Sequence, residues 1–476
     1  MKFYDDDVFF GIVAVIALWV TLICTYTPDR PVAVFAAVSV AALLPAIVCR
    51  RLSWYSKGCA WLLLVCAAII GSGVILNCWY FTTASGGTDA APVLQNFDAE
   101  LNWEFYTMSN IKDLATDRFP GFCFNRASGY PYLMRALGAV FGPSIAFLLG
   151  FNMLCVMLTV ILCGSITRKC MQGHSFNTYV TPGLCAMIVL ASNCYFLVTG
   201  TIFIKDAVIQ LLFACMIYLL IAMKNSRRND AKTLAAAFGT ILLIALVRHQ
   251  LLPLLLPGFF LILFRSRQMW AKILPLCAFT AVVYAAVMAL PTHEEYDMAF
   301  SILTGPRTMH PEKVTTFIVD NSRTDMIFKI TGNLDQQMPW MRVLWLPVTM
   351  LCQFLIPFPW NFTRDMIYGP SQFYAHISYP GYLAGIILCY YILFMWRRGP
   401  RLANRLLCWG IILYAAVAFH WSGTVSRYCL MFIPLAAPAI SFCLLTAWRK
   451  RSLYVWTSLC SVLLASVLIV CHRLSH

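Results

Sequence analysis

The chain has 476 residues, of which 61% are apolar and 12% are charged. A soluble protein carries about twice that charged fraction, so the composition excludes an ordinary soluble globular protein and predicts a polytopic membrane protein. The formal net charge of +15 does not indicate nucleic-acid binding, because the basic residues concentrate in short loops of one parity, that is, in alternate loops that lie on the same side of a membrane.

Apolar runs of membrane length follow one another along most of the chain. They predict an all-α polytopic membrane protein with about 13 transmembrane helices. The first run is long and no small-residue cleavage site follows it, so we expect it to stay as an anchor. The runs lie at 8–27, 31–49, 59–81, 143–167, 177–198, 203–223, 232–248, 250–264, 270–290, 380–396, 403–420, 428–447 and 452–472.

The loops of one parity carry most of the Lys and Arg residues, and the positive-inside rule makes those loops cytoplasmic. The predicted protein therefore lies in the inner or plasma membrane, with its N-terminus inside and its C-terminus outside. The basic residues of these loops are Arg50, Arg51, Lys57, Arg168, Lys169, Lys224, Arg227, Arg228, Lys232, Arg265, Arg267, Lys272, Arg397, Arg398, Arg401, Arg405, Arg449, Lys450 and Arg451.

Another apolar run, 341–360, contains Pro347, Pro357 and Pro359. If it crossed the membrane, the arginine-rich loop after it would lie outside, so we expect a re-entrant or interfacial segment. Short amphipathic helices on the outer face are expected as well. The predicted organisation is then 1–81 for N-terminal transmembrane helices, 82–142 for a first extracytoplasmic loop, 143–290 for a transmembrane core, 291–379 for a second extracytoplasmic segment and 380–476 for C-terminal transmembrane helices.

The first extracytoplasmic loop is acidic and rich in aromatic residues. Asp98, Glu100 and Glu104 lie there beside Trp103 and Tyr106. Carboxylates beside a bilayer are costly unless water or a cation meets them, and a carboxylate placed there could act as a general base towards an acceptor hydroxyl or amine. Solvated loop charges are the alternative interpretation.

Three other segments place basic side chains at the predicted outer face. Lys205 precedes Asp206 at the mouth of a span, where it could reach a lipid phosphate. Arg248 lies between two short apolar runs and could fork onto a phosphate. Arg427 and Tyr428 open a late span from the outside. The alternatives are a snorkelling lysine, an ordinary turn charge and an interfacial anchor pair.

The absence of several common motifs and the pattern of the cysteines narrow the possible functions. The sequence has no Walker A loop, GxGxxG fingerprint, HExxH motif or GxSxG elbow, so nucleotide use from the cytoplasmic side has no support. The 20 cysteines are scattered through apolar runs without a CxxC pair, which is typical of packing residues and not of metal ligands. No cofactor or metal site is predicted, and the sequence leaves the need for a divalent metal open.

In their order along the chain, these elements resemble the membrane-embedded GT-C glycosyltransferases. The resemblance is to the family-39-like branch, which includes protein mannosyltransferases and lipid A aminoarabinose transferases, and it covers about 82–440. After the acidic loop it includes a YP-L-FG stretch, then the Lys-Asp pair, the Arg after a short helix and the late Arg-Tyr. The stretch is Tyr130, Pro131, Leu133, Phe141 and Gly142.

The resemblance implies transfer of a sugar from a polyprenyl-phosphate donor to a glycan, lipid or protein acceptor on the extracytoplasmic face. It implies Asp98 as the base, with Glu100 and Glu104 as alternates. It also implies that the donor phosphate is bound by Lys205, Arg248, Arg427 and Tyr428. Two features depart from the family pattern: the acidic loop follows the third span instead of the first, and no plain Asp-Glu pair marks the base.

Two other functions share the expected architecture. A Wzy-type polysaccharide polymerase or an O-antigen ligase also uses outer arginines, but it needs a diphosphate-linked oligosaccharide. A lipid-linked-sugar flippase or transporter would instead show charged residues within helices along a central path, or an inverted repeat. No such repeat is detectable in this sequence.

Overall fold

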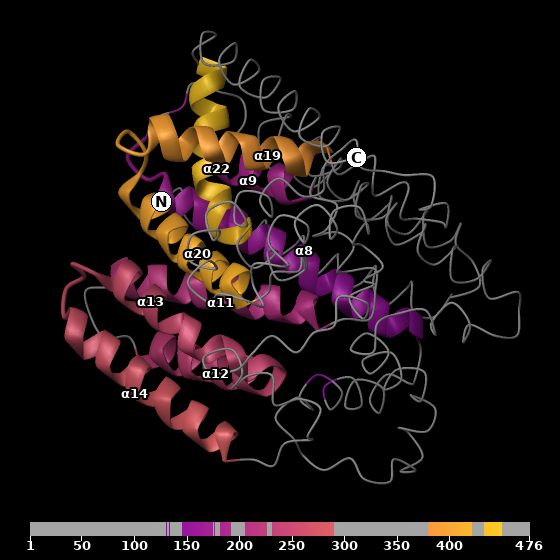
Figure 1. The fold of residues 1–476 in the computed structure, drawn as a ribbon, viewed down its shortest axis with the longest axis vertical. Helices are drawn as coiled ribbons and strands as arrows, with labels where there is room; N and C mark the ends of the chain where they lie inside the picture. Colours follow the sequence, from indigo (N-terminus) through magenta and orange to yellow (C-terminus); the bar gives the residue numbers. More distant parts are fainter. Residues whose placement is uncertain are drawn as a thin grey trace, which may run out of the picture.

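The structure is a computed structural model, and it describes residues 130, 133, 145–174, 176, 181–191, 205–225, 231–289, 379–420 and 433–449. All regular elements within these ranges are helical (Figure 1). They are α8 (Ile145–Cys170), α9 (Pro182–Ala191), α11 (Asp206–Asn225), α12 (Ala231–Arg248), η1 (His249–Leu251), α13 (Leu252–Leu263), α14 (Met269–Met288), α19 (Tyr379–Tyr390), η4 (Tyr391–Met395), α20 (Arg401–His420) and α22 (Ile433–Arg449).

A helix occurs at each predicted apolar run from 143–167 to 270–290 and from 380–396 to 428–447. Within the described residues, 3 helical stretches are long and apolar enough to cross a membrane: Asp206–Asn225, Ala231–Leu263 and Met269–Met288. These findings support an all-helical protein compatible with a membrane. The remaining predicted runs and the segment 341–360 lie outside the described residues, so the total of about 13 spans stays a prediction.

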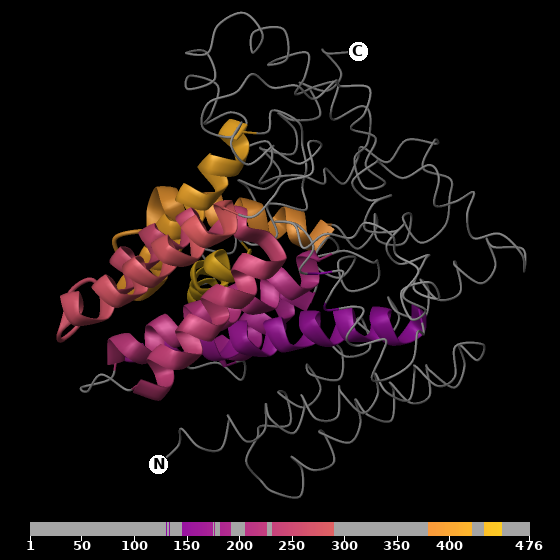
Figure 2. The same ribbon diagram turned by 90° about the horizontal axis from the view of Figure 1, so that it is seen from below.

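The charges at the ends of α8 and α11 follow the helix dipole. Asp206 lies in the first turn of α11 and Lys224 lies in its last turn. Arg168 and Lys169 lie in the last turn of α8. A carboxylate near the N-terminus and cations near the C-terminus each stabilise the unpaired backbone groups there. In both views α11 lies beside α8 (Figures 1 and 2).

The stretch Ala231–Leu263 reverses direction at its middle. Arg248 has φ −158° and ψ 81°, outside the helical region, and η1 follows it before α13 begins. The proline at the start of α13 fits there because the first turn needs no backbone donor. A straight helix of this length would measure about 50 Å. Instead, α12 ends beside the start of α11, and α13 returns towards the end of α11.

Trp409 of α20 holds α13 and α11 together. Its indole is fully buried, and its Nε1 donates to the Leu254 carbonyl of α13 at 2.9 Å. Its ring centroid lies 4.8 Å from that of Phe213 on α11. Gly258 of α13 faces the indole so closely that a Cβ there would lie 2.4 Å from the ring. A glycine is therefore needed for α20 to approach α13 this closely.

The exposed side chains of α12 and α14 are apolar, except for Lys232 in the first turn of α12. Every exposed position of α14 carries an apolar side chain. A surface of this kind is unfavourable in water and is suited to contact with lipid tails. The large exposed apolar side chains of these two helices are Leu242, Leu243, Leu246, Trp270, Leu274 and Val282.

Candidate functional site

Basic side chains from several helices meet at one end of the bundle. Lys272 Nζ donates to the Met223 carbonyl at 2.6 Å, which joins the start of α14 to the last turns of α11. Arg405 Nη1 donates to the Phe264 carbonyl at 2.8 Å, which joins the start of α20 to the loop after α13. The last carbonyl groups of a helix have no hydrogen-bond donor within that helix, and Lys and Arg side chains can supply one.

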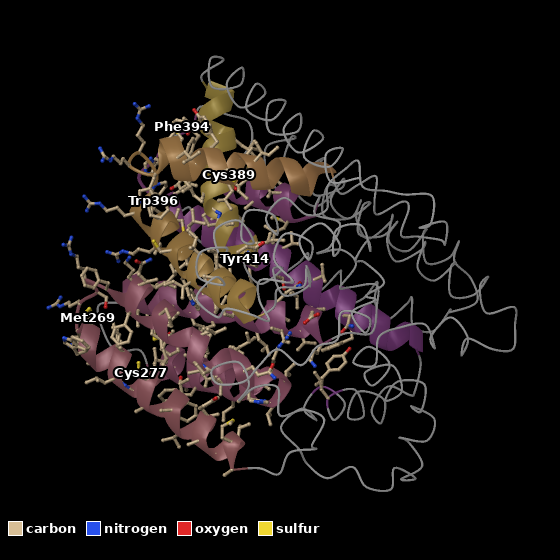
Figure 3. The ribbon with its side chains drawn as sticks, viewed as in Figure 1. Met269, Cys277, Cys389, Phe394, Trp396 and Tyr414 are labelled. Carbon is tan, nitrogen blue, oxygen red and sulfur yellow. The ribbon has the colours of Figure 1, made fainter. Side chains whose placement is uncertain are left out.

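Further contacts extend this group of cations. Lys169 Nζ of α8 lies 3.5 Å from the ring centroid of Tyr218 on α11. Nitrogen-tipped side chains project from the edge of the bundle where Met269 and Trp396 lie (Figure 3). We call this region the basic end; its residues are Arg168, Lys169, Lys224, Arg265, Arg267, Lys272, Arg397, Arg398, Arg401 and Arg405. The described loops that the positive-inside rule assigns to the cytoplasmic side thus lie close together in the structure.

The opposite end of α11 and α12 carries an ion pair. Arg248 Nη1 lies 3.1 Å from Asp206 Oδ1, and the two side chains are 11% and 7% exposed. The pair joins the first residue of α11 to the last residue of α12. We call this region the ion-pair end. Asp206 is the only carboxylate in the part of the chain that the structure describes.

The ion pair compensates two charges that would each be costly to bury alone. Asp206 also lies at the N-terminus of α11, where the helix dipole favours a negative charge. Arg248 is held by Asp206 in one orientation although its backbone leaves the helix at that residue. The geometry therefore fixes a guanidinium at a corner between two helices.

Other polar side chains lie towards this end of the helices. Lys205, which is partly buried, directly precedes Asp206, and buried Gln210 follows one turn later on α11. His249 is buried immediately after Arg248. Counted over the described residues alone, two cationic side chains, Lys205 and Arg248, and one carboxylate give the ion-pair end an excess of positive charge. Such an excess in a partly buried site suits a phosphate.

A second polar pair joins Tyr130 to the first half of α8. The Tyr130 hydroxyl donates to Asn152 Oδ1 at 3.3 Å, and in the alternative direction Asn152 Nδ2 donates to the same hydroxyl at 3.2 Å. Both residues are buried. Lys169 marks the basic end of α8, and Asn152 lies about 25 Å along the helix from it. The pair therefore lies towards the end of α8 away from the basic end.

The structure brings together two of the predicted phosphate-binding residues. Lys205 directly precedes α11 and Arg248 ends α12, and Asp206 is next to the first in sequence and paired with the second. The pairing of Arg248 with Asp206 was not predicted. The other predicted site residues lie outside the described residues: Asp98, Glu100, Glu104, Arg427 and Tyr428.

Sequence reasoning also missed the buried polar residues Asn152 and Gln210. The available signal was their occurrence within or between apolar runs, since a polar side chain inside a membrane span needs a partner. Among the described residues, no group of three or more His, Cys, Asp or Glu side chains could hold a metal ion.

No protein-family model, curated protein or solved structure matches this chain.

Proposed function

We propose that this chain is an integral membrane glycosyltransferase of the GT-C type. It would move a sugar from a polyprenyl-phosphate donor to a glycan, lipid or protein acceptor. The observation that supports the proposal is that Arg248 pairs with Asp206 at the ion-pair end, opposite the basic end, and that Lys205 directly precedes Asp206 there. By the positive-inside rule the basic end is cytoplasmic, so the converging cations face the extracytoplasmic side.

The proposed reaction is a direct displacement at the anomeric carbon. The bond from that carbon to the phosphate oxygen breaks as a bond to the acceptor oxygen or nitrogen forms, and the configuration inverts. The acceptor proton passes to a carboxylate of the first extracytoplasmic loop, with Asp98 as first choice and Glu100 or Glu104 as alternates. The departing phosphate carries the negative charge, which the basic side chains of the site stabilise.

In this scheme Lys205 and Arg248 bind the donor phosphate together with Arg427 and Tyr428. Arginine suits the task because its planar fork matches two phosphate oxygens, whereas lysine acts as a point charge. The polyprenyl tail would lie against the apolar surface of neighbouring helices, where lipid contact is already favourable. The proposal needs no nucleotide and no redox cofactor.

The decisive test is a transfer assay with radiolabelled polyprenyl-phosphate monosaccharides in membranes that contain the full chain. Mannose, glucose and aminoarabinose donors should be compared. For the accepted donor, Arg248→Lys should lower the rate about a hundredfold, because the charge remains and the fork is lost. Arg427→Ala should abolish transfer while expression stays intact.

A matched control is Arg397→Lys, which makes the same change at an exposed residue of the basic end. It should leave transfer unchanged. Full activity in both Arg248→Lys and Arg427→Ala would exclude these residues from the phosphate site. Activity only with a diphosphate-linked oligosaccharide would indicate a polymerase or ligase instead.

A flippase or other transporter of lipid-linked sugars is the second candidate. The observation that favours it is the buried pair of Asp206 and Arg248, since charged residues within helices are typical of transport paths. Reconstituted vesicles distinguish the two functions. Movement of a labelled lipid-linked sugar across the bilayer without covalent product would support transport and contradict the transferase.

A further inference from the structure

At the basic end, Phe264 brings two guanidinium groups together. The guanidinium carbons of Arg265 and Arg405 each lie 5.5 Å from the Phe264 ring centroid. The Phe264 carbonyl also accepts the hydrogen bond from Arg405 Nη1. A cation within about 6 Å of an aromatic face is attracted to it, so ring and carbonyl together hold both arginines beside this loop.

Two more cations lie close to Arg405. Arg401, one turn before it on α20, repels its charge, as does Arg265. Lys224, at the end of α11, is in turn repelled by Arg405. None of these four side chains has a carboxylate partner among the described residues, where the only carboxylate is at the ion-pair end. Four like charges gathered in this way are stabilised when an anion binds between them.

The loop that presents Arg265 has an unusual backbone. Arg265 has φ 59° and Gln268 has φ 56°, so two non-glycine residues adopt the left-handed conformation within 264–268. Ser266 Oγ is buried in the same loop without a hydrogen-bond partner. Strained residues and unsatisfied polar groups persist when the surroundings enforce them, and they concentrate at ligand sites.

The surface next to this loop is apolar and exposed. Phe260 is 44% exposed and Trp270 is 57% exposed, and their rings pack edge to face with centroids 6.4 Å apart. Leu274, one turn further along α14, is also exposed. A ligand whose phosphate reached the four cations would therefore have apolar protein surface beside it. This combination matches a lipid head group and its acyl chains better than a free phosphate ion.

We propose that the α13–α14 loop, the start of α20 and Lys224 form a binding site for the phosphate of an anionic membrane lipid. The site is separate from the proposed transfer site, because it lies at the opposite end of α11. Arg265 and Arg405 provide the guanidinium forks, and Arg401 and Lys224 add positive charge. The acyl chains lie along Phe260, Trp270 and Leu274 of α13 and α14.

The test measures lipid binding to the purified full chain in a neutral detergent, where no charged bilayer surface contributes. Phosphatidylglycerol is the probe, phosphatidylcholine is the neutral comparison, and native mass spectrometry counts the bound lipid. The wild type should bind phosphatidylglycerol and not phosphatidylcholine. The double variant Arg265→Gln/Arg405→Gln should raise the dissociation constant about thirtyfold, since each basic residue contributes about 1 kcal/mol.

The control is Arg397→Gln/Arg398→Gln, which removes the same charge from exposed residues of the same end. It should keep affinity within about twofold of the wild type. An equal loss in both double variants would overturn the site, as would unchanged binding in Arg265→Gln/Arg405→Gln. If that variant fails to fold, Arg265→Gln alone changes an exposed residue and should weaken binding about fivefold.

A third arm separates a lipid from a free anion. Inorganic phosphate is titrated against the bound phosphatidylglycerol, and each is also titrated against the protein alone. Inorganic phosphate should compete only weakly, because it has no acyl chains to contact the apolar surface. Binding of inorganic phosphate as tightly as phosphatidylglycerol would overturn the assignment to a lipid.

Discussion

The two ends of the described bundle both carry arginine, but they compensate its charge in opposite ways. At the ion-pair end, Arg248 lies against Asp206, and both side chains are almost fully buried. At the basic end, Arg405 lies near Arg265, Arg401 and Lys224, and no described carboxylate accompanies them. Arg248 is thus paired within the protein, whereas the described part of the chain offers the other group of cations no carboxylate.

The difference shows why net charge alone says little about function in a membrane protein. The positive-inside rule accounts for cations that remain at an interface with water and lipid head groups. It does not account for an arginine at a helix corner that is held by a carboxylate from another helix. An arginine held in this way has a fixed orientation, which is what a phosphate-binding site requires.

The largest expected effect is on stability at the ion-pair end. Asp206→Ala leaves the Arg248 guanidinium buried without its partner, and removing one member of a buried pair costs about 3–5 kcal/mol. The free energy of unfolding, measured by denaturant titration of the purified protein in detergent, should fall by that amount.

The double variant Asp206→Leu/Arg248→Met tests the cause of that loss. It removes both charges and keeps apolar volume, so it should be closer to the wild type than Asp206→Ala is. If Asp206→Ala proved as stable as the wild type, the pair would be exposed to water and the contrast between the two ends would disappear.

A smaller effect is expected at the helix that connects the two ends. In Gly258→Ala the new Cβ meets the Trp409 indole, which is rigid and fully buried. Overpacking of this kind costs about 1–3 kcal/mol. Because α13 runs from the Arg248 corner to the Phe264 loop, we expect weaker lipid binding at the basic end together with the lower stability.

Gly239→Ala is the matched control for this prediction. A Cβ at Gly239 meets no atom within 4 Å, and alanine favours a helix by about 1 kcal/mol relative to glycine. This variant should be at least as stable as the wild type in the same denaturant titration. Equal destabilisation by both substitutions would show that Trp409 does not determine the position of α13.

The helices themselves could be predicted from the sequence. Apolar runs of membrane length give α8, α11, α12, α14 and α20 to within a few residues, because burial or lipid contact requires such runs. The parity of the charged loops also predicts which helix ends lie together. In the structure, Lys272 contacts the end of α11 and Arg405 contacts the end of α13, in agreement with that parity.

The contacts within each end could not be predicted. Asp206 and Arg248 are 42 residues apart, and their contact depends on the packing register of α11 against α12. From the sequence alone, Asp206 is explained by the helix dipole and Arg248 by a turn. The position of Arg265 and Arg405 around Phe264 depends on two left-handed residues in a loop that contains no glycine. Nothing in local propensity indicates that conformation.

The smallest expected effect is that of Arg401→Gln at the basic end, and Arg248→Gln makes the same change at the ion-pair end for comparison. Arg401 is exposed and repels Arg405, so Arg401→Gln should raise the free energy of unfolding in neutral detergent by about 0.3–0.5 kcal/mol. Arg248→Gln should lower it, because Asp206 then loses the charge that compensates it. Salt separates the two effects further. At about 1 M ionic strength the Debye length is about 3 Å, so the gain at exposed Arg401 should vanish while the loss at buried Arg248 persists. If Arg401→Gln and Arg248→Gln both lowered the free energy of unfolding, at low and at high salt, the two ends would compensate charge alike.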